Sequence, residues 1–362
     1  MDPLLSKAAS KPRALTHREL ALLLTFPDAK ALFAAAYAVK VREFGRRISL
    51  RGLVEFANVC EKDCFYCGIR KANGQVERYM MSADEIVSAA ERSFNSGYGS
   101  IVLQSGEISS EVHVAFVEEV IRRIRAIAGD DFGITLSLGE QAEATYRRWR
   151  EAGAHRYLLR IETSNPTLYA ALHPSDHSWE RRLDCLRSLR RCGYQVGSGT
   201  MAGLPGQSVD DLASDIEFFA SEDLDMIGMG PYIPHADTPL GRGVRWEAQD
   251  KAQRLELGLR MIAVTRLYMH DVNIAAATAL QALDSEGRER GILAGANVIM
   301  PNATPARFRM NYRLYANKPC LGEDFEACRG CIERRIGIIG EQILWNERGD
   351  SPHWRKRKDG KH

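Results

Sequence analysis

Short apolar runs alternate with longer amphipathic stretches over most of the chain, and this alternation predicts the fold. The apolar runs have the length of buried strands and occupy residues 48–57, 99–104, 133–137, 156–161, 195–199, 225–230, 272–276 and 297–300. Between most of them, apolar residues recur at the spacing of a helix face. Eight strand–helix units of this kind predict an α/β protein, a complete parallel (β/α)8 barrel of the TIM type.

A doubly wound parallel sheet is the alternative that the same alternation allows. Such sheets commonly hold a nucleotide against a glycine-rich loop after the first strand. No Gly-x-Gly-x-x-Gly follows residues 48–57, and the sequence contains no Walker lysine motif. The barrel is therefore the favoured prediction.

The pattern divides the chain into three parts. Residues 1–46 are predicted to form an N-terminal region, with a loose polar arm over 1–15 followed by helices that cap one end of the barrel. Residues 47–303 are predicted to form the barrel, and residues 304–362 a C-terminal extension. The basic run at 354–358 is expected to be a disordered end.

Composition narrows the class of protein. Hydrophobic residues make up 45% and charged residues 27% of the 362 positions, as in ordinary globular proteins. The net charge of +2 gives no indication of a nucleic-acid or membrane partner. The longest apolar run, residues 31–39, is too short to span a bilayer, and the first residues do not resemble a signal peptide. We expect a cytoplasmic protein.

Three cysteines follow the first predicted strand within eight residues. Cys60, Cys64 and Cys67 are spaced Cys-x3-Cys-x2-Cys. Three thiolates so close together can hold one metal centre, but closed zinc sites and most iron–sulfur sites use four protein ligands. On a four-iron cluster, three thiolates leave one iron open to a substrate, and we would then expect an oxygen-poor cell. A zinc knuckle lacking one ligand, or three reduced thiols near a turn, are the alternatives.

A second group of thiols lies in the C-terminal extension. Cys320, Cys328 and Cys331 are spaced Cys-x7-Cys-x2-Cys, which fits a second iron–sulfur cluster, of two or four irons, or a vestigial site. Cys185 and Cys192 lie seven residues apart on one face of a predicted helix. We predict that these two belong to the core.

Polar residues gather just after the predicted strands, where such barrels place their active sites. The candidates are the segments 104–107 (Gln-Ser-Gly-Glu), 137–140 (Ser-Leu-Gly-Glu) and 160–166, the glycine-rich segments 197–207 and 228–235, and His235 as a proton donor. A carboxylate such as Glu162 suits two ribose hydroxyls, and a guanidinium such as Arg182 suits a carboxylate. Simple turns, and for Arg182 a solvated helix face, are the alternatives.

Together these residues resemble the radical S-adenosylmethionine (SAM) maturases of FeFe-hydrogenases, the HydE family. The resemblance covers residues 16–345 and is most specific at 60–70, 101–107, 135–140, 156–166, 203–207, 228–240 and 295–302. Biotin synthases and methylornithine synthases are similar in architecture, but they match fewer of these segments.

The resemblance implies a cofactor set, a reaction and a set of site residues. Cys60, Cys64 and Cys67 would hold a 4Fe-4S cluster whose open iron binds SAM, and one electron would cleave SAM to methionine and a 5′-deoxyadenosyl radical. Tyr66 would pack near the adenine, and the other expected SAM contacts are Ser105, Ser137, Glu162 and Arg182.

The resemblance also implies a substrate and partners. The substrate would be an iron–carbonyl–cyanide–cysteine complex supplied by the enzyme HydG, on the way to the two-iron subsite of the hydrogenase. A ferredoxin or flavodoxin would supply the electron.

Two departures from the family bear on the substrate. Ile161 stands where the family usually has His, and Ala277 precedes Thr278 where it usually has two threonines. Both departures are predicted to line the barrel interior near the substrate. These departures leave open a second hypothesis, a radical SAM enzyme of amino-acid metabolism such as a methylornithine-type mutase. The third hypothesis is a non-catalytic iron–sulfur or zinc protein.

Overall fold

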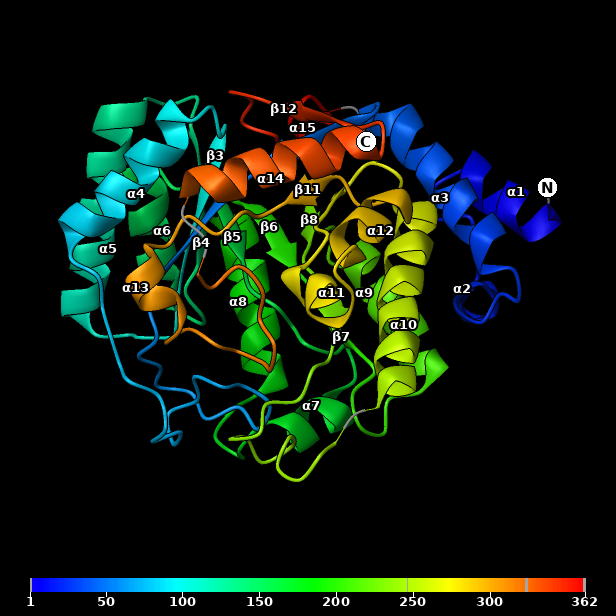
Figure 1. Cartoon of the computed structure of the whole chain (residues 1–362), viewed down its shortest axis with the longest axis horizontal. Coiled ribbons are helices and arrows are strands. Elements are labelled where there is room, and N and C mark those ends of the chain that lie inside the picture. The colour runs from blue at the N-terminus through cyan, green and yellow to red at the C-terminus, as the bar shows by residue number, and fades with distance from the viewer. Residues whose placement is uncertain (1, 246, 323–324, 361–362) are drawn as a thin grey trace.

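The computed structural model describes residues 2–245, 247–322 and 325–360 (Figure 1). Its strands are β1 (Arg47–Leu50), β2 (Gly52–Ala57), β3 (Ser100–Ser105), β4 (Gly133–Ser137), β5 (Arg156–Leu158), β6 (Gln195–Ser198), β7 (Met201–Ala202), β8 (Met226–Ile227), β9 (Gly230–Pro231), β10 (Asn273–Ile274), β11 (Val298–Ile299) and β12 (Gln342–Leu344). The helices before residue 200 are α1 (Pro3–Ser10), α2 (His17–Leu24), α3 (Ala29–Phe44), α4 (Ala83–Asn95), α5 (Glu111–Ala128), α6 (Glu143–Ala152), α7 (Pro166–Leu172) and α8 (Trp179–Arg191). The later helices are α9 (Val209–Ser221), α10 (Ala248–Tyr268), α11 (Thr278–Leu283), α12 (Gly287–Leu293), α13 (Ala306–Arg309), α14 (Phe325–Ile338) and α15 (Pro352–Lys358).

Parallel strands form the barrel wall. Within the described residues, one sheet of seven strands has the order β10-β8-β6-β5-β4-β3-β2, and every neighbouring pair is parallel. β11 and the residues just after it join the two edges through parallel bridges, Ala275 with Val298 on one side and Leu53 with Asn302 on the other. The predicted (β/α)8 barrel is confirmed, including its eighth strand.

The strands read as continuous apolar runs because both of their faces are covered. In β3 all positions but one are buried, and in β4 the same holds. The outer helices begin where the sequence provides caps: Thr16, Ser82 and Ser208 each form a capping box at the start of α2, α4 and α9. The main apolar core lies between these helices and the barrel wall.

The N-terminal arm differs from the prediction. Residues 3–10 form α1, because Asp2 accepts hydrogen bonds from the backbone N–H groups of Leu4 and Leu5 and Pro3 occupies the first turn. Buried Leu5 and Ala8 hold α1 against α3, a contact that composition alone does not indicate. α3 packs against α10 and α2 against α9, so these helices cover the side of the barrel and not its end.

The C-terminal extension closes the end of the barrel at which the strands begin. β12 pairs in parallel with β1, and β12 and α15 lie at the opposite end of the barrel from α7 (Figure 1). A Cβ at Gly99 would lie 1.8 Å from the carbonyl oxygen of Glu347, so the chain runs directly over the start of β3. Asp350 accepts hydrogen bonds from Arg156 at 2.5 Å and Gln195 at 2.7 Å. This end of the barrel is sealed by residues 345–351.

The basic tail is also ordered, which corrects the prediction of a disordered end. Residues 352–358 form α15. Arg357 donates hydrogen bonds to both carboxylate oxygens of Asp225 at 2.8 Å, and Lys356 contacts Asp271 at 2.9 Å. The acidic partners lie far earlier in the sequence, so the local charge run could not show them.

His353 should make the stability of the protein depend on pH. Its ring lies between Asp223 at 2.7 Å and Asp271 at 3.1 Å. Burial alone would lower its pKa, but these two carboxylates outweigh burial and raise the pKa to about 9. The histidine is protonated in the folded state and neutral in the unfolded state between its ordinary pKa and 9. Its stabilisation is complete below about pH 6.5 and is lost as the pH rises through 9.

We expect this contribution to be about 1–3 kcal/mol, and it should be absent from His353→Gln. The measurement is the denaturant midpoint of both proteins at pH 6 and pH 10. The wild type should lose more stability than the variant over this interval. An equal loss in both proteins would show that His353 does not carry the effect.

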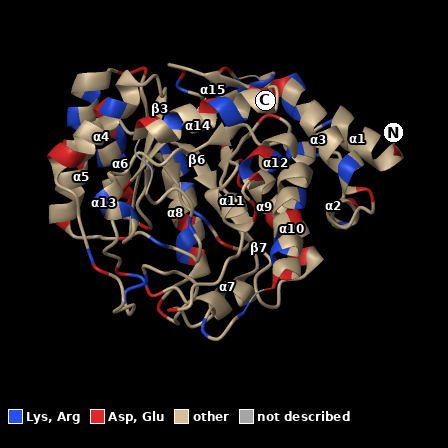
Figure 2. Ribbon diagram, in the orientation of Figure 1, with Lys and Arg blue, Asp and Glu red and all other residues tan. Residues whose placement is uncertain are grey.

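Basic and acidic residues are both spread along the ribbon in Figure 2, and helices such as α8 and α10 carry both signs. The helices of the described chain include no single one that is both long and apolar enough to cross a membrane. α2 and α3, joined by a bend of 119°, meet that length and composition only as a pair.

Candidate active site

A cavity of about 320 Å³ opens among the loops that follow the barrel strands. All eight residues predicted for the cluster and the SAM contacts line it: Cys60, Cys64, Tyr66, Cys67, Ser105, Ser137, Glu162 and Arg182. They come from five separate stretches of the chain. The fold therefore brings the predicted site together in one place.

The loop that carries the three thiols follows β2 directly and is fixed by backbone contacts. The backbone N–H of Glu107 points at the sulfur of Cys60 at 3.3 Å, and Glu61 N–H donates to the carbonyl of Glu107 at 2.8 Å. Gly106 is needed here, because a Cβ would lie 2.1 Å from the carbonyl oxygen of Val59. The glycine in segment 104–107 thus lets that segment lie against the thiol loop.

The chemistry of the three thiols fits a metal cluster. Burial raises the pKa of Cys60, raises that of Cys64 to about 12, and raises that of Cys67 well above its ordinary value. Thiolates are the form that binds metal, so these sulfurs need a strong positive charge beside them to ionise. None of the three forms a disulfide. A 4Fe-4S cluster bound by three thiolates fits these residues.

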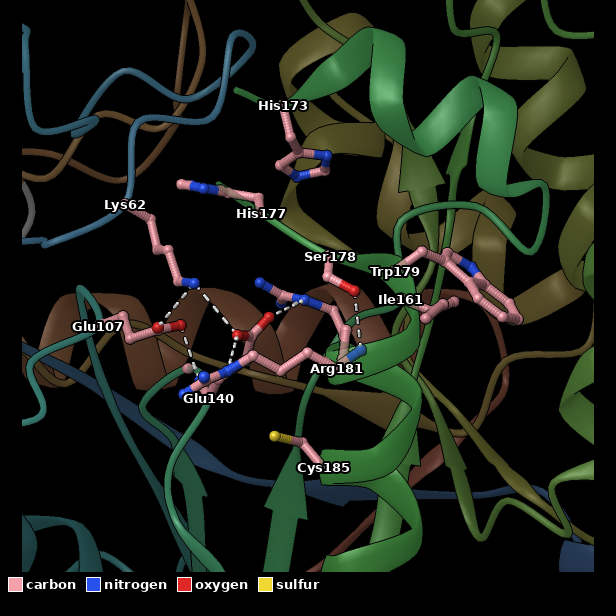
Figure 3. A network of polar contacts seen from close by, with 12 residues as sticks. Lys62, Glu107, Glu140, Ile161, His173, His177, Ser178, Trp179, Arg181 and Cys185 are labelled. Carbon is pink, nitrogen blue, oxygen red and sulfur yellow. Dashed lines mark hydrogen bonds and ion pairs between the residues drawn. The ribbon is translucent and has the colours of Figure 1, made fainter. Parts of the chain in front are cut away.

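A network of charged side chains lies beside the thiol loop (Figure 3). Lys62, within the loop, lies 3.4 Å from Glu107 and 3.1 Å from Glu140, and Arg182 donates to Glu140 at 2.9 Å. Burial raises the pKa of Glu107. Burial acts in the same direction on Glu140, but Arg182 and Lys62 outweigh it and hold its pKa below the ordinary value. Both glutamates lie in the predicted loop motifs, but no pattern in the sequence indicates that Lys62 joins them.

Glu162 is held in a strained backbone conformation. Its φ of +69° lies in the left-handed region, which costs a non-glycine residue about 1–2 kcal/mol. Its N–H donates to the carbonyl of Gly199 at 3.1 Å and its carbonyl accepts from Met201 at 3.0 Å, which fixes it against the next strand. Arg160 lies 3.0 Å from its carboxylate. Strain maintained by so many contacts is typical of functional sites.

Tyr66, Ser105 and Ser137 complete the part of the cavity near the thiols. The hydroxyl of Tyr66 lies 3.5 Å from Nε2 of His173, whose ring meets the tyrosine ring edge-on. Ser105 donates its hydroxyl hydrogen to the carbonyl of Gly106 at 2.6 Å. Ser137 ends β4 and lines the same wall. The aromatic ring and the two hydroxyls match the apolar face and the polar groups of a nucleoside.

The other part of the cavity is charged, and none of the predicted motifs contains its ion pair. Glu55 on β2 forms a buried ion pair with Lys318, which also donates to the carbonyl of Tyr312 at 2.8 Å. Gln104 donates to the hydroxyl of Tyr312 at 3.2 Å. Segment 312–320 thus lies across the barrel interior, tied to β2 by a pair of residues 263 positions apart. No local pattern signals such a pair.

Several predicted residues lie elsewhere. Ile161 is fully buried in the apolar core and does not line the cavity, which corrects its expected place, whereas Ala277 and Thr278 do line it. His235 packs against Gly68 outside the cavity lining. Cys185 is buried in the core as predicted, and Cys192 is half-buried against it.

The two glycine-rich segments have different surroundings. Gly228 and Gly230 line the cavity, as expected of a backbone that lies against a ligand. The glycines of segment 197–207 do not line it. Gly199, for example, lies against the backbone of Gly228, where a Cβ would approach the carbonyl oxygen to 2.2 Å.

The second thiol group lies beside a different, smaller cavity. Cys320, Cys328 and Cys331 line one small cavity of about 30 Å³ beside α14. Cys320 and Arg288 line both this cavity and the larger one. Arg288 donates to the sulfur of Cys320 at 3.6 Å, and Arg309 donates to its carbonyl oxygen at 3.1 Å.

Comparisons with known proteins identify relatives of this chain. The model of the radical SAM superfamily matches residues 54–219. The [FeFe] hydrogenase maturase subunit HydE of Thermotoga maritima is 42% identical over 86% of each chain. The 3-methylornithine synthase of Methanosarcina barkeri is 28% identical over 88% of this chain and 94% of its own.

Solved structures show the same fold. Methylornithine synthase (PylB) superposes with a TM-score of 0.81 at 24% identity, covering 95% of this chain and 98% of its own. The maturase HydG from Carboxydothermus hydrogenoformans superposes with a TM-score of 0.77 at 19% identity, covering 98% of this chain and 80% of its own. Taken with the thiol loop and the cavity, the relationship to the T. maritima protein shows that this chain belongs to the radical SAM superfamily and, within it, to the HydE family of FeFe-hydrogenase maturases.

Proposed function

We propose that the cavity binds SAM beside a 4Fe-4S cluster on Cys60, Cys64 and Cys67, and that the enzyme acts in assembly of the two-iron subsite of FeFe-hydrogenase. One observation carries this proposal: the three thiols and the five expected SAM contacts, from separate parts of the chain, line a single cavity. When bound, the cluster supplies the electron that cleaves SAM and generates the 5′-deoxyadenosyl radical.

Different side chains of the cavity would bind different groups of SAM. Arg182 suits the methionine carboxylate, and Glu140 already holds its guanidinium in the cavity wall. Glu162 suits the ribose hydroxyls as an acceptor, and its fixed backbone gives the carboxylate one direction. Tyr66 offers a face or edge to the adenine, and its own ring is positioned by His173.

The barrel itself protects a reactive intermediate. The end at which its strands begin is sealed by residues 345–351, and Arg156 and Asp350 are buried partners in that seal. Segment 312–320 covers part of the cavity from the other direction. A radical formed inside is thereby kept from bulk water and from quenching side chains on the surface.

The proposed substrate is the iron–carbonyl–cyanide–cysteine complex made by HydG. The support is the family membership, since the T. maritima relative is a maturase subunit. A mutase of amino-acid metabolism is the competing function, and the similarity to 3-methylornithine synthase favours keeping it in the test. Ala277 lines the cavity at a position that differs from the usual family residue, so substrate choice has to be measured.

The experiment is a comparison of two substrates with the reduced, anaerobically reconstituted protein. With SAM and the HydG product, we expect 5′-deoxyadenosine and subsequent activation of a hydrogenase that lacks its two-iron subsite. With SAM and lysine, we expect no methylornithine. Formation of methylornithine would replace the maturase assignment, and absence of 5′-deoxyadenosine under all conditions would refute radical SAM chemistry.

We further propose that the second thiol group binds an iron–sulfur cluster and that a ferredoxin or flavodoxin donates the electron. The convergence of Cys320, Cys328 and Cys331 on one small cavity supports the cluster. α14 contributes two of the thiols, three residues apart and hence nearly one turn apart, and Cys320 comes from the segment before it. Basic and acidic positions are intermixed along the ribbon in Figure 2, which singles out no segment for the donor.

A further inference from the structure

Arg288 occupies an unusual position in the cavity wall. It lies on α12, is 7% exposed, and lines both the large cavity and the small cavity of the second thiol group. The proposed function gives it no role, since the expected SAM contacts lie around the first thiol loop. Its neighbours in the wall of the large cavity include Thr278, Asn302 and Tyr315.

Charge pairing distinguishes Arg288 from the other cations of the cavity. Lys62 and Arg182 pair with Glu140, Arg160 lies 3.0 Å from Glu162, and Lys318 pairs with Glu55. Arg288 contacts Cys320 through one nitrogen, and no carboxylate of the described chain lies within 4.0 Å of its guanidinium. A buried charge without a counterion is costly, so such a group is retained where a ligand supplies the opposite charge.

The geometry of the guanidinium points to the kind of ligand. An arginine presents five donors in a planar fork that matches a carboxylate at two points. Cys320 takes one donor, Nη2, and the arginine that carries the other donors lines the large cavity. The thiol contact also holds the side chain, because Arg309 fixes the backbone of Cys320, whose φ is +61°. The fork is therefore oriented before any ligand arrives.

We propose that Arg288 is a specificity-determining residue that binds a carboxylate of the molecule on which the radical acts. This proposal rests on the proposed function and adds a feature of the substrate: an anionic group at the end of the cavity nearest the second thiol group. Cys320 acts as a positioning residue for this interaction, which gives the second thiol group a role in substrate binding through Arg288.

The test uses the reconstituted protein loaded with S-adenosylhomocysteine, so that no radical forms. Calorimetry measures the affinity of S-methyl-L-cysteine and of its carboxamide, which lacks the negative charge. The wild type should bind the carboxylate at least tenfold more tightly than the carboxamide, as expected of a hydrogen-bonded charge pair. Arg288→Gln should lose this preference, and Arg288→Lys should retain part of it because the charge remains.

Arg290→Gln is the matched control. It removes an arginine from the same helix, but this arginine is 44% exposed and pairs with Asp284 at 2.7 Å, so the preference should be unchanged. Equal affinity of the wild type for the two probes, or a preference retained in Arg288→Gln, would overturn the inference. Failure of S-adenosylhomocysteine to bind the wild type would instead contradict the proposed function. Arg288→Lys keeps the inference testable if the glutamine variant does not fold.

Discussion

Cys64→Ala should abolish the formation of 5′-deoxyadenosine from SAM. Cys64 is one of three thiols that would hold the cluster, and two thiolates are too few to retain four irons in a site open to exchange. Changes to groups that merely support a metal ligand cost about 10- to 100-fold. Loss of a ligand should therefore cost more than about 100-fold. The measurement is 5′-deoxyadenosine produced by the dithionite-reduced protein, together with its iron content.

Cys192→Ala is the control for this experiment, because Cys192 is a half-buried thiol at the end of α8 that touches neither cavity. It should retain full iron content and full SAM cleavage. Iron that stays bound in Cys64→Ala and disappears when Cys331→Ala is added would belong to the second thiol group. Retention of wild-type cleavage in Cys64→Ala would show that the cluster lies elsewhere.

Lys40→Met should destabilise the fold more than any surface change. Lys40 on α3 and Glu341 form an ion pair in which both side chains are 0% exposed, and Tyr37 donates to the same carboxylate at 2.5 Å. Burial lowers the pKa of Lys40, and Glu341 acts against that shift. Removing the lysine leaves a carboxylate buried without its counterion, which costs about 3–5 kcal/mol. The measurement is the denaturant midpoint and the melting temperature.

Two further variants identify the cause. Lys30→Met changes an exposed lysine on the same helix and should have little effect. The double variant Lys40→Met with Glu341→Gln removes both charges and should recover part of the loss, because a neutral pair of similar volume is tolerated far better than a lone charge. If the double variant were as unstable as the single one, packing and not the unpaired charge would be responsible.

The barrel could be predicted from the sequence because its strands are buried on both faces. Each strand reads as an apolar run, and the helices between them carry local signals such as the capping boxes at Ser82 and Ser208. The loose arm and the disordered tail were wrong for a common reason. α1 is held by buried Leu5 and Ala8, and α15 by Asp223, Asp225 and Asp271, and such partners are distant in sequence.

The candidate site, like the fold, has parts that the sequence predicts and parts that it does not. The thiols, Ser105, Ser137 and Glu162 lie at or after the ends of strands, so that topology places them together, whereas Arg182 lies on α8. The resemblance to a family supplied the roles of all of these residues. Glu55 with Lys318, and Arg288 with Cys320, are not local patterns, because each pair joins residues that only the folded C-terminal segment brings together. Ile161 was misplaced because it lies beside Arg160, yet its side chain faces the core and not the cavity.

The pairing of β1 with β12 has a consequence for how the protein is made. Strand β1 begins at Arg47 and its partner ends at Leu344, and the barrel wall itself meets only at the bridge between Leu53 and Asn302, so the ribosome must release most of the chain before either pairing can form. At ordinary rates of synthesis this takes about 15–60 s after β1 has emerged. During that interval the nascent chain exposes Cys60, Cys64 and Cys67 without their enclosing wall. Insertion of iron and sulfur therefore belongs after translation, and oxidants reach these thiols most easily while the chain is still growing.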